Sequence, residues 1–466
     1  MNRYIAIILF LFSSYLNAQF KNQTMISIDN PNFRKLVVAI PDISLESKDP
    51  LALKYVDQIR AELPFLLQFT GFFKPLDKKA YEDKKKENKA EDQQFWKMLS
   101  VDTAINVVLV KNGKLTNVEI SGLDVYRGRD LDKKVYLINN ENALNEALKR
   151  YVDYLLTFYT GKPGIFQSKI VFAGRTGPKA PREIFICDPD GSNVEQITRT
   201  KAIHISPSWH PSGEKIIFTS YESNRPTLFV YDLHTKVTSR LGGLASGKGI
   251  SNSGGKFAPQ GKLLAYTEYK EGNGTPSNSG SADIFIAPSP EEKGMRREFI
   301  KGNGINVDPI FSPDGKWLAF VSGRYGNPHI FRSELAWNSD YTDIQIKNEQ
   351  RLTFAGWWNA MPSWSPDSKR IVFAGFDKDI NRFDIFIMNN DGTKMERLTL
   401  QSGDNKSPSF SPNGQMLVFH SSRVGTASDR GRNQLYVMNQ DGTEQRNLAT
   451  GLYDAEDPKW GPFTGN

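Results

Sequence analysis

The sequence predicts a mainly β protein, a six-bladed β-propeller of four-stranded antiparallel blades preceded by a small α/β domain. Two observations predict the propeller. A motif built on proline, an aromatic residue and a tight turn recurs six times in the C-terminal two thirds of the chain. The copies are spaced at the length of one blade, which is the pattern of a repeat protein. Helical periodicity before the first copy predicts the separate α/β domain.

The repeated motif reads Pro-x-aromatic-Ser-Pro-Asp-Gly in its fullest form and is followed by an apolar strand. Its six aromatic residues are Trp209, Phe257, Phe311, Trp364, Phe410 and Trp460. Successive members of this set are 48, 54, 53, 46 and 50 residues apart. Each unit also holds an aromatic-centred strand, and several units turn through Asp-Gly, as at residues 190–191 and 391–392. Four strands joined by such hairpin turns make one antiparallel blade.

The two ends of the repeat predict how the ring closes. The first strand-like segment, residues 168–172, corresponds to the second strand of a unit, and residues 457–460 near the C-terminus supply the missing first strand. Closure of this kind removes the exposed sheet edges that would otherwise template aggregation. We expect the six aromatic side chains to pack between blades, and carbohydrate stacking on them is the alternative.

Before the repeat, residues 19–161 are expected to form the α/β domain, and residues 162–466 the propeller, with a hinge at residues 161–164. The predicted helices, which share apolar residues at helical spacing, span residues 51–70, 79–98 and 141–159. The predicted strands span residues 34–40, 104–110, 118–120 and 134–138. Pro64 is expected to kink the first helix, and Asn140 is expected to cap the third.

The first 18 residues have the pattern of a secretory signal peptide. Asn2 and Arg3 precede an apolar run from Ile5 to Phe12, and Ala18 ends a cleavage site. This run is far shorter than the roughly 20 residues that span a membrane. We therefore expect an exported, periplasmic protein that reaches membranes only through partners. A short buried helix is the alternative interpretation of this segment.

The charge distribution and the cysteine content further limit the kinds of protein that this sequence can be. The formal net charge of +7 is spread along the chain, and the lysine run at residues 84–86 is mixed with acidic residues, which is typical of a solvated helix face. We expect no nucleic-acid partner. Cys187 is the only cysteine, so the fold has no internal disulfide, and its apolar surroundings predict a buried side chain.

No motif for catalysis or cofactor binding stands out. The run Gly249-Ile250-Ser251-Asn252-Ser253 lacks the closing glycine of the Gly-x-Ser-x-Gly hydrolase motif. The five histidines lie far apart without the spacing of metal ligands. The acidic turn at residues 188–193 resembles a calcium loop, but its counterparts in other units are plain turns. We expect a protein that is not an enzyme and has no cofactor or metal. An exported propeller enzyme or sugar-binding lectin stays open, and an acidic pair converging in the central channel would favour it.

Three segments outside the repeat resemble the TolB family, the periplasmic propellers of the Tol–Pal system. Residues 159–166 (Tyr-Thr-Gly-Lys-Pro-Gly-Ile-Phe) resemble the family's Leu-Thr-Gly-x-Pro-Gly-x-Phe junction, and residues 71–77 resemble its Ser-Gly-x-Phe-x-x-Leu-Asp segment. Residues 26–29 with residues 36–41 resemble its mature N-terminus. The resemblance covers nearly the whole mature chain. An insertion at residues 84–94 and the strand near Ile105 depart from the family pattern, and a TolB-like paralogue acting as an envelope scaffold, lectin or hydrolase accessory is the alternative.

The resemblance implies protein binding without catalysis. TolB proteins bind the outer-membrane lipoprotein Pal through one mouth of the propeller and the inner-membrane protein TolA through the N-terminal segment, which implies a role in outer-membrane integrity and constriction during cell division. Repeat geometry and this resemblance place the Pal contacts at Ser206, Ser251, Asp308, Met361, Ser407 and Asp457. The TolA arm is expected in residues 19–33, with contacts at Phe20, Ile26, Ile28 and Asp29. Ordinary solvated loops are the alternative for the mouth positions, and we expect a monomer.

Overall fold

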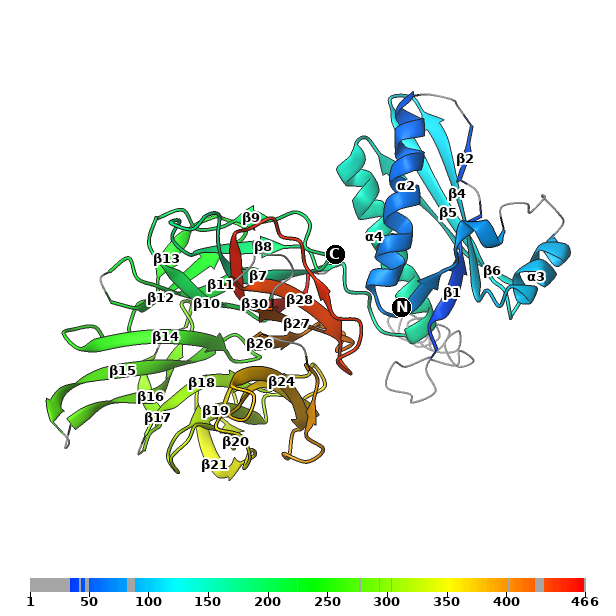
Figure 1. Ribbon diagram of the computed structural model, residues 1–466. Helices are drawn as coiled ribbons and strands as arrows, with labels where there is room; N and C mark the ends of the chain where they lie inside the picture. Colours follow the sequence, from blue (N-terminus) through cyan, green and yellow to red (C-terminus); the bar gives the residue numbers. More distant parts are fainter. Residues whose placement is uncertain are drawn as a thin grey trace, which may run out of the picture. The chain divides into compact units, whose positions relative to one another are not determined.

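The computed structural model describes residues 34–41, 43–46, 50–81, 89–223, 225–275, 278–292, 294–302, 304–400, 403–423 and 431–464. The chain divides into two compact units, Met1–Gly164 and Ile165–Asn466 (Figure 1). The predicted signal peptide and the predicted TolA arm lie outside the described residues. Within the described ranges, no helix combines the length and the hydropathy needed to cross a membrane.

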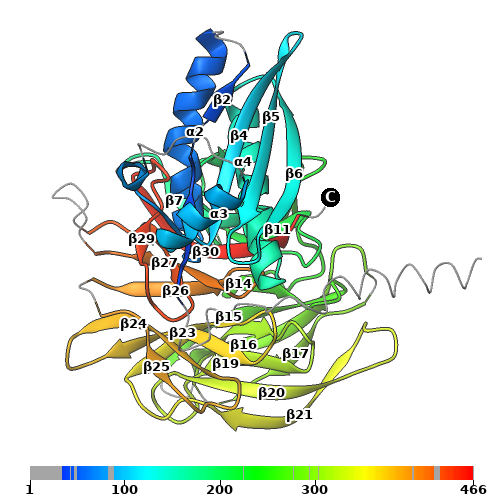
Figure 2. The ribbon, with the colours of Figure 1, turned by 90° about the vertical axis from the view of Figure 1, so that its right-hand side faces the viewer.

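The N-terminal unit is a mixed sheet with helices packed against it. Its strands are β1 (Leu36–Ala39), β2 (Ile43–Leu45), β3 (Phe73–Pro75), β4 (Thr103–Asn112), β5 (Leu115–Asp124) and β6 (Arg129–Ile138). Their order is β3-β1-β4-β5-β6, and β2 also pairs with β4. The helices are α2 (Pro50–Phe69), α3 (Lys89–Met98) and α4 (Glu141–Thr160), with a 3-10 turn, η1, at Lys78–Ala80. In the view of Figure 2, α4 lies behind β4, β5 and β6.

Helix α4 shows why this unit folds as its sequence predicts. The Asn140 side chain accepts a hydrogen bond from the Ala143 N–H at 2.8 Å, which confirms the predicted N-cap. A buried stripe that includes Leu148 and Leu155 faces the core. The helix ends at Gly161, whose φ of 67° is left-handed and lets its N–H reach the Thr157 carbonyl.

The predicted helix over residues 79–98 is wrong at its start. Residues 78–80 form a 3-10 turn, which the Asp77 side chain caps by accepting a hydrogen bond from the Lys79 N–H. Tyr81 then leaves the helical region with φ −145°, and its ring packs edge-on against Trp96 at 5.4 Å. Burial of this ring pair in one core cluster favours the non-helical backbone of Tyr81 over a helical one. Helix α3 begins at Lys89, and Pro64 lies inside α2, which continues to Phe69.

The C-terminal unit is a closed ring of six four-stranded antiparallel sheets, as predicted. We number the blades from the one that contains β7. The strands are, in blade 1, β30 (Asp454–Phe463), β7 (Ser168–Arg175), β8 (Glu183–Cys187) and β9 (Glu195–Gln196); in blade 2, β10 (His204–Trp209), β11 (Lys215–Ser220), β12 (Thr227–Asp232) and β13 (Thr238–Arg240); in blade 3, β14 (Ile250–Phe257), β15 (Leu263–Thr275), β16 (Asn278–Pro288) and β17 (Arg297–Ile300); in blade 4, β18 (Asn306–Phe311), β19 (Trp317–Ser322), β20 (His329–Trp337) and β21 (Ile344–Arg351); in blade 5, β22 (Trp358–Trp364), β23 (Arg370–Asp377), β24 (Arg382–Asn389) and β25 (Glu396–Arg397); and in blade 6, β26 (Asn405–Phe410), β27 (Met416–Ser421), β28 (Gln434–Asn439) and β29 (Arg446–Asn447). The first strand given for each blade is its inner strand.

Blade 1 closes the ring. Its inner strand, β30, comes from the C-terminal end of the chain and pairs antiparallel with β7, with Trp460 opposite Ile170. The prediction from the two ends of the repeat is confirmed. The Trp460 indole N–H also donates to the Ser168 hydroxyl at 2.8 Å, across 292 positions of sequence.

The six motif aromatics are buried between blades, as expected. Phe311, for example, packs in one cluster with Leu263 of blade 3 and Phe320 of blade 4. Relative exposure of the six side chains is between 5% and 9%, so carbohydrate stacking on them is excluded by burial. Two of the tryptophans also donate an indole N–H to the inner strand of the preceding blade, Trp209 to the Lys459 carbonyl and Trp364 to the Ile310 carbonyl.

We predict that Trp460→Ala destabilises the propeller by about 3–5 kcal/mol, because it removes a buried aromatic group and the hydrogen bond that joins β30 to β7. Urea unfolding followed by tryptophan fluorescence and circular dichroism measures this change. Trp357→Ala is the matched control, since Trp357 is 48% exposed. Equal stability of the two variants would contradict closure through β30.

Candidate functional site

A register shift interrupts the inner strand of every blade. The shifts lie between Ile205 and Ser208, Ser253 and Lys256, Val307 and Ile310, Ala360 and Ser363, Lys406 and Ser409, and Glu456 and Lys459. In five blades the second residue within the shift is proline, which has no N–H for the ladder and is therefore placed at a bulge. The motif proline thus fixes where each inner strand bends.

The first of the two residues within each register shift has a left-handed backbone conformation in all six blades. The φ angles are 52° at Ser206, 67° at Gly254, 53° at Asp308, 55° at Met361, 52° at Ser407 and 51° at Asp457. Only glycine adopts this conformation without strain, which costs other residues about 1–3 kcal/mol each. Five non-glycine residues hold it here, and strain of this kind is concentrated at binding sites.

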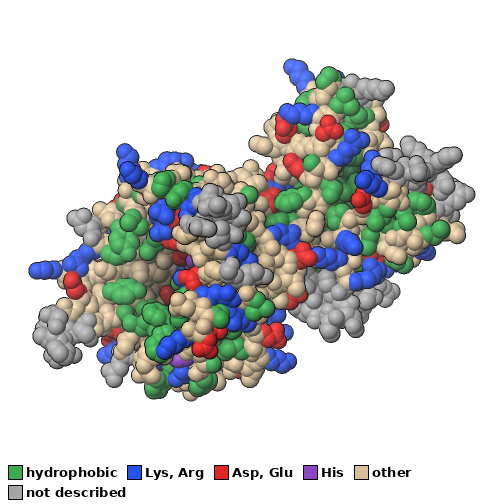
Figure 3. All heavy atoms as spheres, viewed as in Figure 1, with side chains coloured by type: hydrophobic (Ala, Val, Ile, Leu, Met, Phe, Trp, Pro, Cys, Tyr) green, Lys and Arg blue, Asp and Glu red, His purple; other side chains and the backbone are tan. Residues whose placement is uncertain are grey.

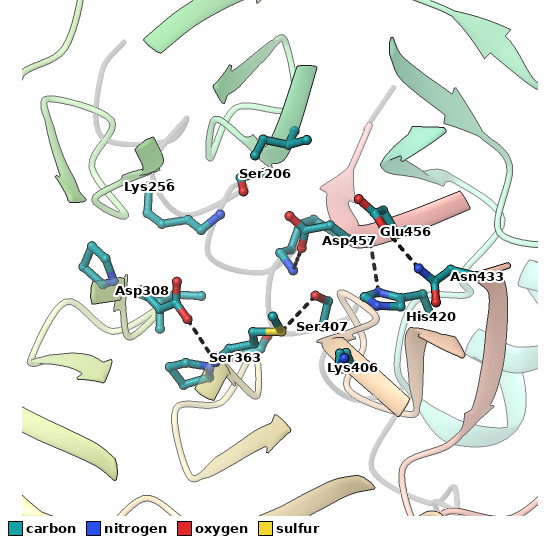
Figure 4. A pocket seen from close by; sticks show the side chains of 17 residues that line it. Ser206, Lys256, Asp308, Ser363, Lys406, Ser407, His420, Asn433, Glu456 and Asp457 are labelled. Atoms are coloured by element: carbon teal, nitrogen blue, oxygen red, sulfur yellow. Dashed lines mark hydrogen bonds and ion pairs between the residues drawn. The ribbon is translucent and has the colours of Figure 1, made fainter. Parts of the chain in front are cut away.

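These six positions line one cavity of about 340 Å³ in the mouth of the propeller (Figure 4). Five of the six residues predicted as Pal contacts therefore lie together. Ser251 does not: it lines a separate hollow beside Tyr269 and Glu271. Gly254 occupies the equivalent position in blade 3. There Gly254-Gly255 replaces the pair that ends in the motif proline, so the motif does not indicate the position of the bulge.

Charged side chains of both signs line the cavity. Most of them are paired. Lys459 forms an ion pair with Asp457 at 2.8 Å, and Lys406 forms one with Asp404 at 2.8 Å. Glu456 is held by Arg182, also at 2.8 Å, and accepts from the Asn433 amide. The motif predicted Asp308 and Asp457 but missed the lysines: Lys406 precedes the left-handed residue of its blade, and Lys256 follows a Gly-Gly pair that does not match the motif.

Asp457 and Asp308, two of the three carboxylates that line the cavity, have opposite pKa shifts. Desolvation raises the pKa of Asp457, but the nearby ammonium groups of Lys459 and Lys256 outweigh it and hold the pKa at about 2. Desolvation also raises the pKa of Asp308, and there the hydrogen bond from the Met361 N–H and the charge of Lys256 only partly oppose the rise. Asp457 is therefore ionised throughout the physiological range.

His420 is a neutral group in the lining of the cavity. Its Nδ1 accepts a hydrogen bond from the Asp457 N–H at 3.1 Å, which requires an unprotonated nitrogen. Burial lowers its pKa to about 4, despite the attraction of Asp457. The imidazole thus supports the left-handed backbone at Asp457 in its neutral form.

Exposed aromatic residues lie on or beside the connections that enter the inner strands of blades 2 to 5. We call this set the aromatic rim: Tyr221, Tyr269, Tyr325, Phe354, Trp357 and Trp358. Phe354 is the most exposed member at 75%. The Arg351 guanidinium lies 5.0 Å from its ring, and the Lys378 ammonium lies 4.5 Å from the ring of Trp357. In the space-filling view, hydrophobic side chains lie beside a hollow in the propeller, among basic and acidic ones (Figure 3).

Such a surface is suited to binding another protein. Aromatic residues and arginine are enriched at protein interfaces, and contiguous exposed apolar patches mark interaction sites. Over the described ranges, no group of three or more His, Cys, Asp or Glu side chains is arranged to hold a metal ion.

Fold and mouth together define the class: a six-bladed β-propeller with an N-terminal α/β domain and a polar mouth bordered by exposed aromatics. A model of the TolB beta propeller domain matches residues 157–464, and a model of the TolB amino-terminal domain matches residues 24–131. Because the propeller match alone covers more than half of the sequence, the chain belongs to the TolB family.

Individual relatives agree with this family. The Tol-Pal system protein TolB of Bordetella parapertussis is 28% identical over 355 residues, which cover 76% of this chain and 69% of that protein. The Tol-Pal system protein TolB of Ruegeria sp. is 29% identical over 211 residues, or 45% of this chain, and the chain spans about half (47%) of that relative. The crystal structure of TolB from Acinetobacter baumannii has the same fold, with a TM-score of 0.72 at 23% identity over 92% of this chain and 97% of that one.

We predict that the propeller loses stability as the pH falls from about 6.5 to about 4. Burial lowers the pKa of both His420 and His329 to about 4, whereas the unfolded chain binds these protons near pH 6.5. Their stabilisation is complete above pH 6.5 and is lost below it, by at most about 1.4 kcal/mol per pH unit for each group. His420→Gln, which keeps an acceptor for the Asp457 N–H, should reduce this slope in urea titrations at pH 7, 6 and 5. His234→Gln, on an exposed turn, should leave the slope unchanged.

Proposed function

We propose that this chain is a periplasmic, protein-binding component of the Tol–Pal envelope complex. It binds a Pal-like outer-membrane lipoprotein at the propeller mouth and a TolA-like inner-membrane protein through residues 19–33, and it acts as a monomer without catalysis. In this role it supports outer-membrane integrity and constriction during cell division. Membership of the TolB family supports the assignment to the Tol–Pal system. The assignment of the mouth as the binding site is supported by five predicted contacts that line one cavity: Ser206, Asp308, Met361, Ser407 and Asp457.

The mouth has the physical properties that such recognition needs. Its inner-strand residues are fixed by bulges and by neighbouring blades, so little conformational entropy is lost when a partner docks. The aromatic rim offers apolar area around a small polar centre, which is the usual organisation of an interface with a few dominant contacts.

A sugar-binding or hydrolytic function is the second candidate, and one observation favours it. Asp308 and Asp457 line the same cavity, and their pKa values are shifted in opposite directions, as in an acid–base pair. Against it, Asp457 is already paired with Lys459, and the charge of Lys256 lies near both acids. Incubation of the mature protein with peptidoglycan fragments, followed by mass spectrometry, should give no cleavage.

The mouth assignment is tested by Asp308→Arg. Reversal of the charge inside the cavity should weaken binding of the organism's own Pal-like lipoprotein by about tenfold or more, which is about 1.4 kcal/mol. Isothermal calorimetry with the mature chain from Gln19 measures the affinity. Glu195→Arg on the outermost strand β9, away from the mouth, is the matched charge-reversal control and should bind like wild type.

Equal weakening by both variants would show a long-range charge effect and not a contact. If Asp308→Arg binds as tightly as the wild type, the Pal-like partner is supported but the interface lies on another surface. No binding by the wild type would contradict the Pal-like partner and favour the paralogue or lectin.

The N-terminal arm is tested by deletion of residues 19–29, which contain Phe20, Ile26, Ile28 and Asp29. We expect loss of binding to the TolA-like protein, with binding to the Pal-like protein retained, since the two sites lie in separate units. Pull-downs with each purified partner measure both effects. Retained TolA-like binding would contradict the assignment of the arm.

A further inference from the structure

We infer that the mouth cavity is a carboxylate-binding site, in which the Lys256 ammonium holds an acidic side chain of the docking protein. The inference rests on the proposed function, because the acidic side chain belongs to the partner at the mouth. It assigns chemistry to a residue that the sequence motif did not single out.

Lys256 differs from the other charged groups of the cavity. Among the described residues its ammonium group, which has three N–H donors, forms no hydrogen bond or ion pair, and only the charges of Lys459, Asp457 and Asp308 act on it. Lys459, Lys406 and Glu456 each have an ion-pair partner. Figure 4 shows the Lys256 side chain extending into the cavity on the side of Ser206, without a dashed contact.

An internal comparison between blades shows which group is missing. Lys256 in blade 3 and Lys459 in blade 1 occupy the same register position, immediately after the bulge. Two residues before Lys459 stands Asp457, its ion-pair partner. Two residues before Lys256 stands Gly254, which has no side chain. The lysine is thus present in both blades, but its counterion is present only in blade 1. The space where blade 3 lacks the counterion, at Gly254, faces the cavity.

The position of Gly254 leaves room for an incoming group. A Cβ atom built there would meet no heavy atom within 4 Å. The cavity volume of about 340 Å³ is sufficient for one side chain of a docking protein. The Ser206 hydroxyl, on the inner strand between those of Lys256 and Asp457, lines the same space and adds a neutral donor for a carboxylate oxygen.

Electrostatics agree with an anionic ligand. Burial and then the charge of Lys459 lower the pKa of Lys256 to about 8, while Asp457 and Asp308 attract its proton without pairing with it. The other titratable groups lining the cavity are Lys406, His420 and Glu456. A carboxylate that contacts the ammonium would stabilise its charged form and raise the pKa again. Binding should therefore take up protons above pH 8.

The site can be tested without any partner protein. The mature chain is labelled with ¹³Cε-lysine, the Lys256 signal is assigned by Lys256→Arg, and N-acetyl-aspartate amide is titrated in at pH 8. We expect a saturable shift of the Lys256 signal and a rise of its pKa by about one unit or more. N-acetyl-lysine amide is the control ligand and should give neither. A Lys256 signal that responds equally to both compounds, or to neither, overturns the carboxylate site.

The role in partner binding is tested by Lys256→Met. We expect affinity for the Pal-like lipoprotein to fall about tenfold or more at pH 7. Wild-type affinity should decline between pH 8 and 9.5 towards that of the variant, whose affinity stays constant over this range. Lys215→Met, in an ion pair with Glu291 outside the cavity, is the matched control and should behave like wild type. Wild-type binding unaffected by Lys256→Met overturns the inference and leaves the Tol–Pal proposal standing. No wild-type binding contradicts the Tol–Pal proposal, and the titration with the small carboxylate then decides the site alone.

The thermal stability of Lys256→Met shows whether a loss of binding comes from the missing ammonium group or from unfolding of the propeller. A charged Lys256 whose pKa is lowered from 10.5 to about 8 destabilises the folded state below pH 8, and this cost disappears as the pH rises towards 10.5. Lys256→Met should therefore raise the melting temperature at pH 7, by roughly 2 °C or more, and give no gain near pH 10.5. A lower melting temperature at pH 7 would show that the lysine already has a partner within the folded chain.

Discussion

The structure of the mouth depends on the pairing of β30 with β7. This one pairing brings the last strand of the chain beside the first strand of the repeat and turns an open stack of sheets into a ring. It also delivers Asp457 and Lys459 to the cavity, opposite the side chains of blades 3 and 4. Closure therefore has two consequences: it removes two sheet edges, and it completes the charged lining of the proposed binding site.

The same bulge is used six times, and the side chains it presents make the site asymmetric. Each bulge places one left-handed residue at the cavity, and the type of this residue differs between blades. Blade 1 presents an acid with its own lysine, blade 3 presents glycine before a lysine, and blade 4 presents an acid alone. A nearly symmetric scaffold thus carries a charge arrangement without symmetry, which allows a partner to dock in one orientation. An unpaired lysine at this place costs stability, as is common where a fold keeps a group for binding.

Much of the fold follows from the sequence because the repeat consists of residues with strong preferences for particular backbone conformations or for burial. Proline, the buried aromatic and the Asp-Gly turn fix the strand ends, so blade number and ring closure were predictable. The helix over residues 79–98 was predicted too long, since burial of Tyr81 against Trp96 is a tertiary effect. In blade 3 the predicted segment, residues 251–254, includes Gly254, but Ser251 was the contact named within it, because this blade lacks the proline that marks the register. Lys256 could not be singled out from sequence, as its lack of a counterion depends on which side chains the ring brings together.

The central claim is that the mouth of the propeller is the surface that meets the Pal-like lipoprotein. Hydrogen–deuterium exchange of the mature chain, alone and with that lipoprotein, tests it over the whole surface at once. The account predicts slower exchange in the inner strands at residues 204–209, 250–257 and 306–311 and in the rim connection at residues 353–358, with no change in the turns at residues 190–193 and 441–444. Protection confined to those turns, or to the N-terminal unit, would contradict the account.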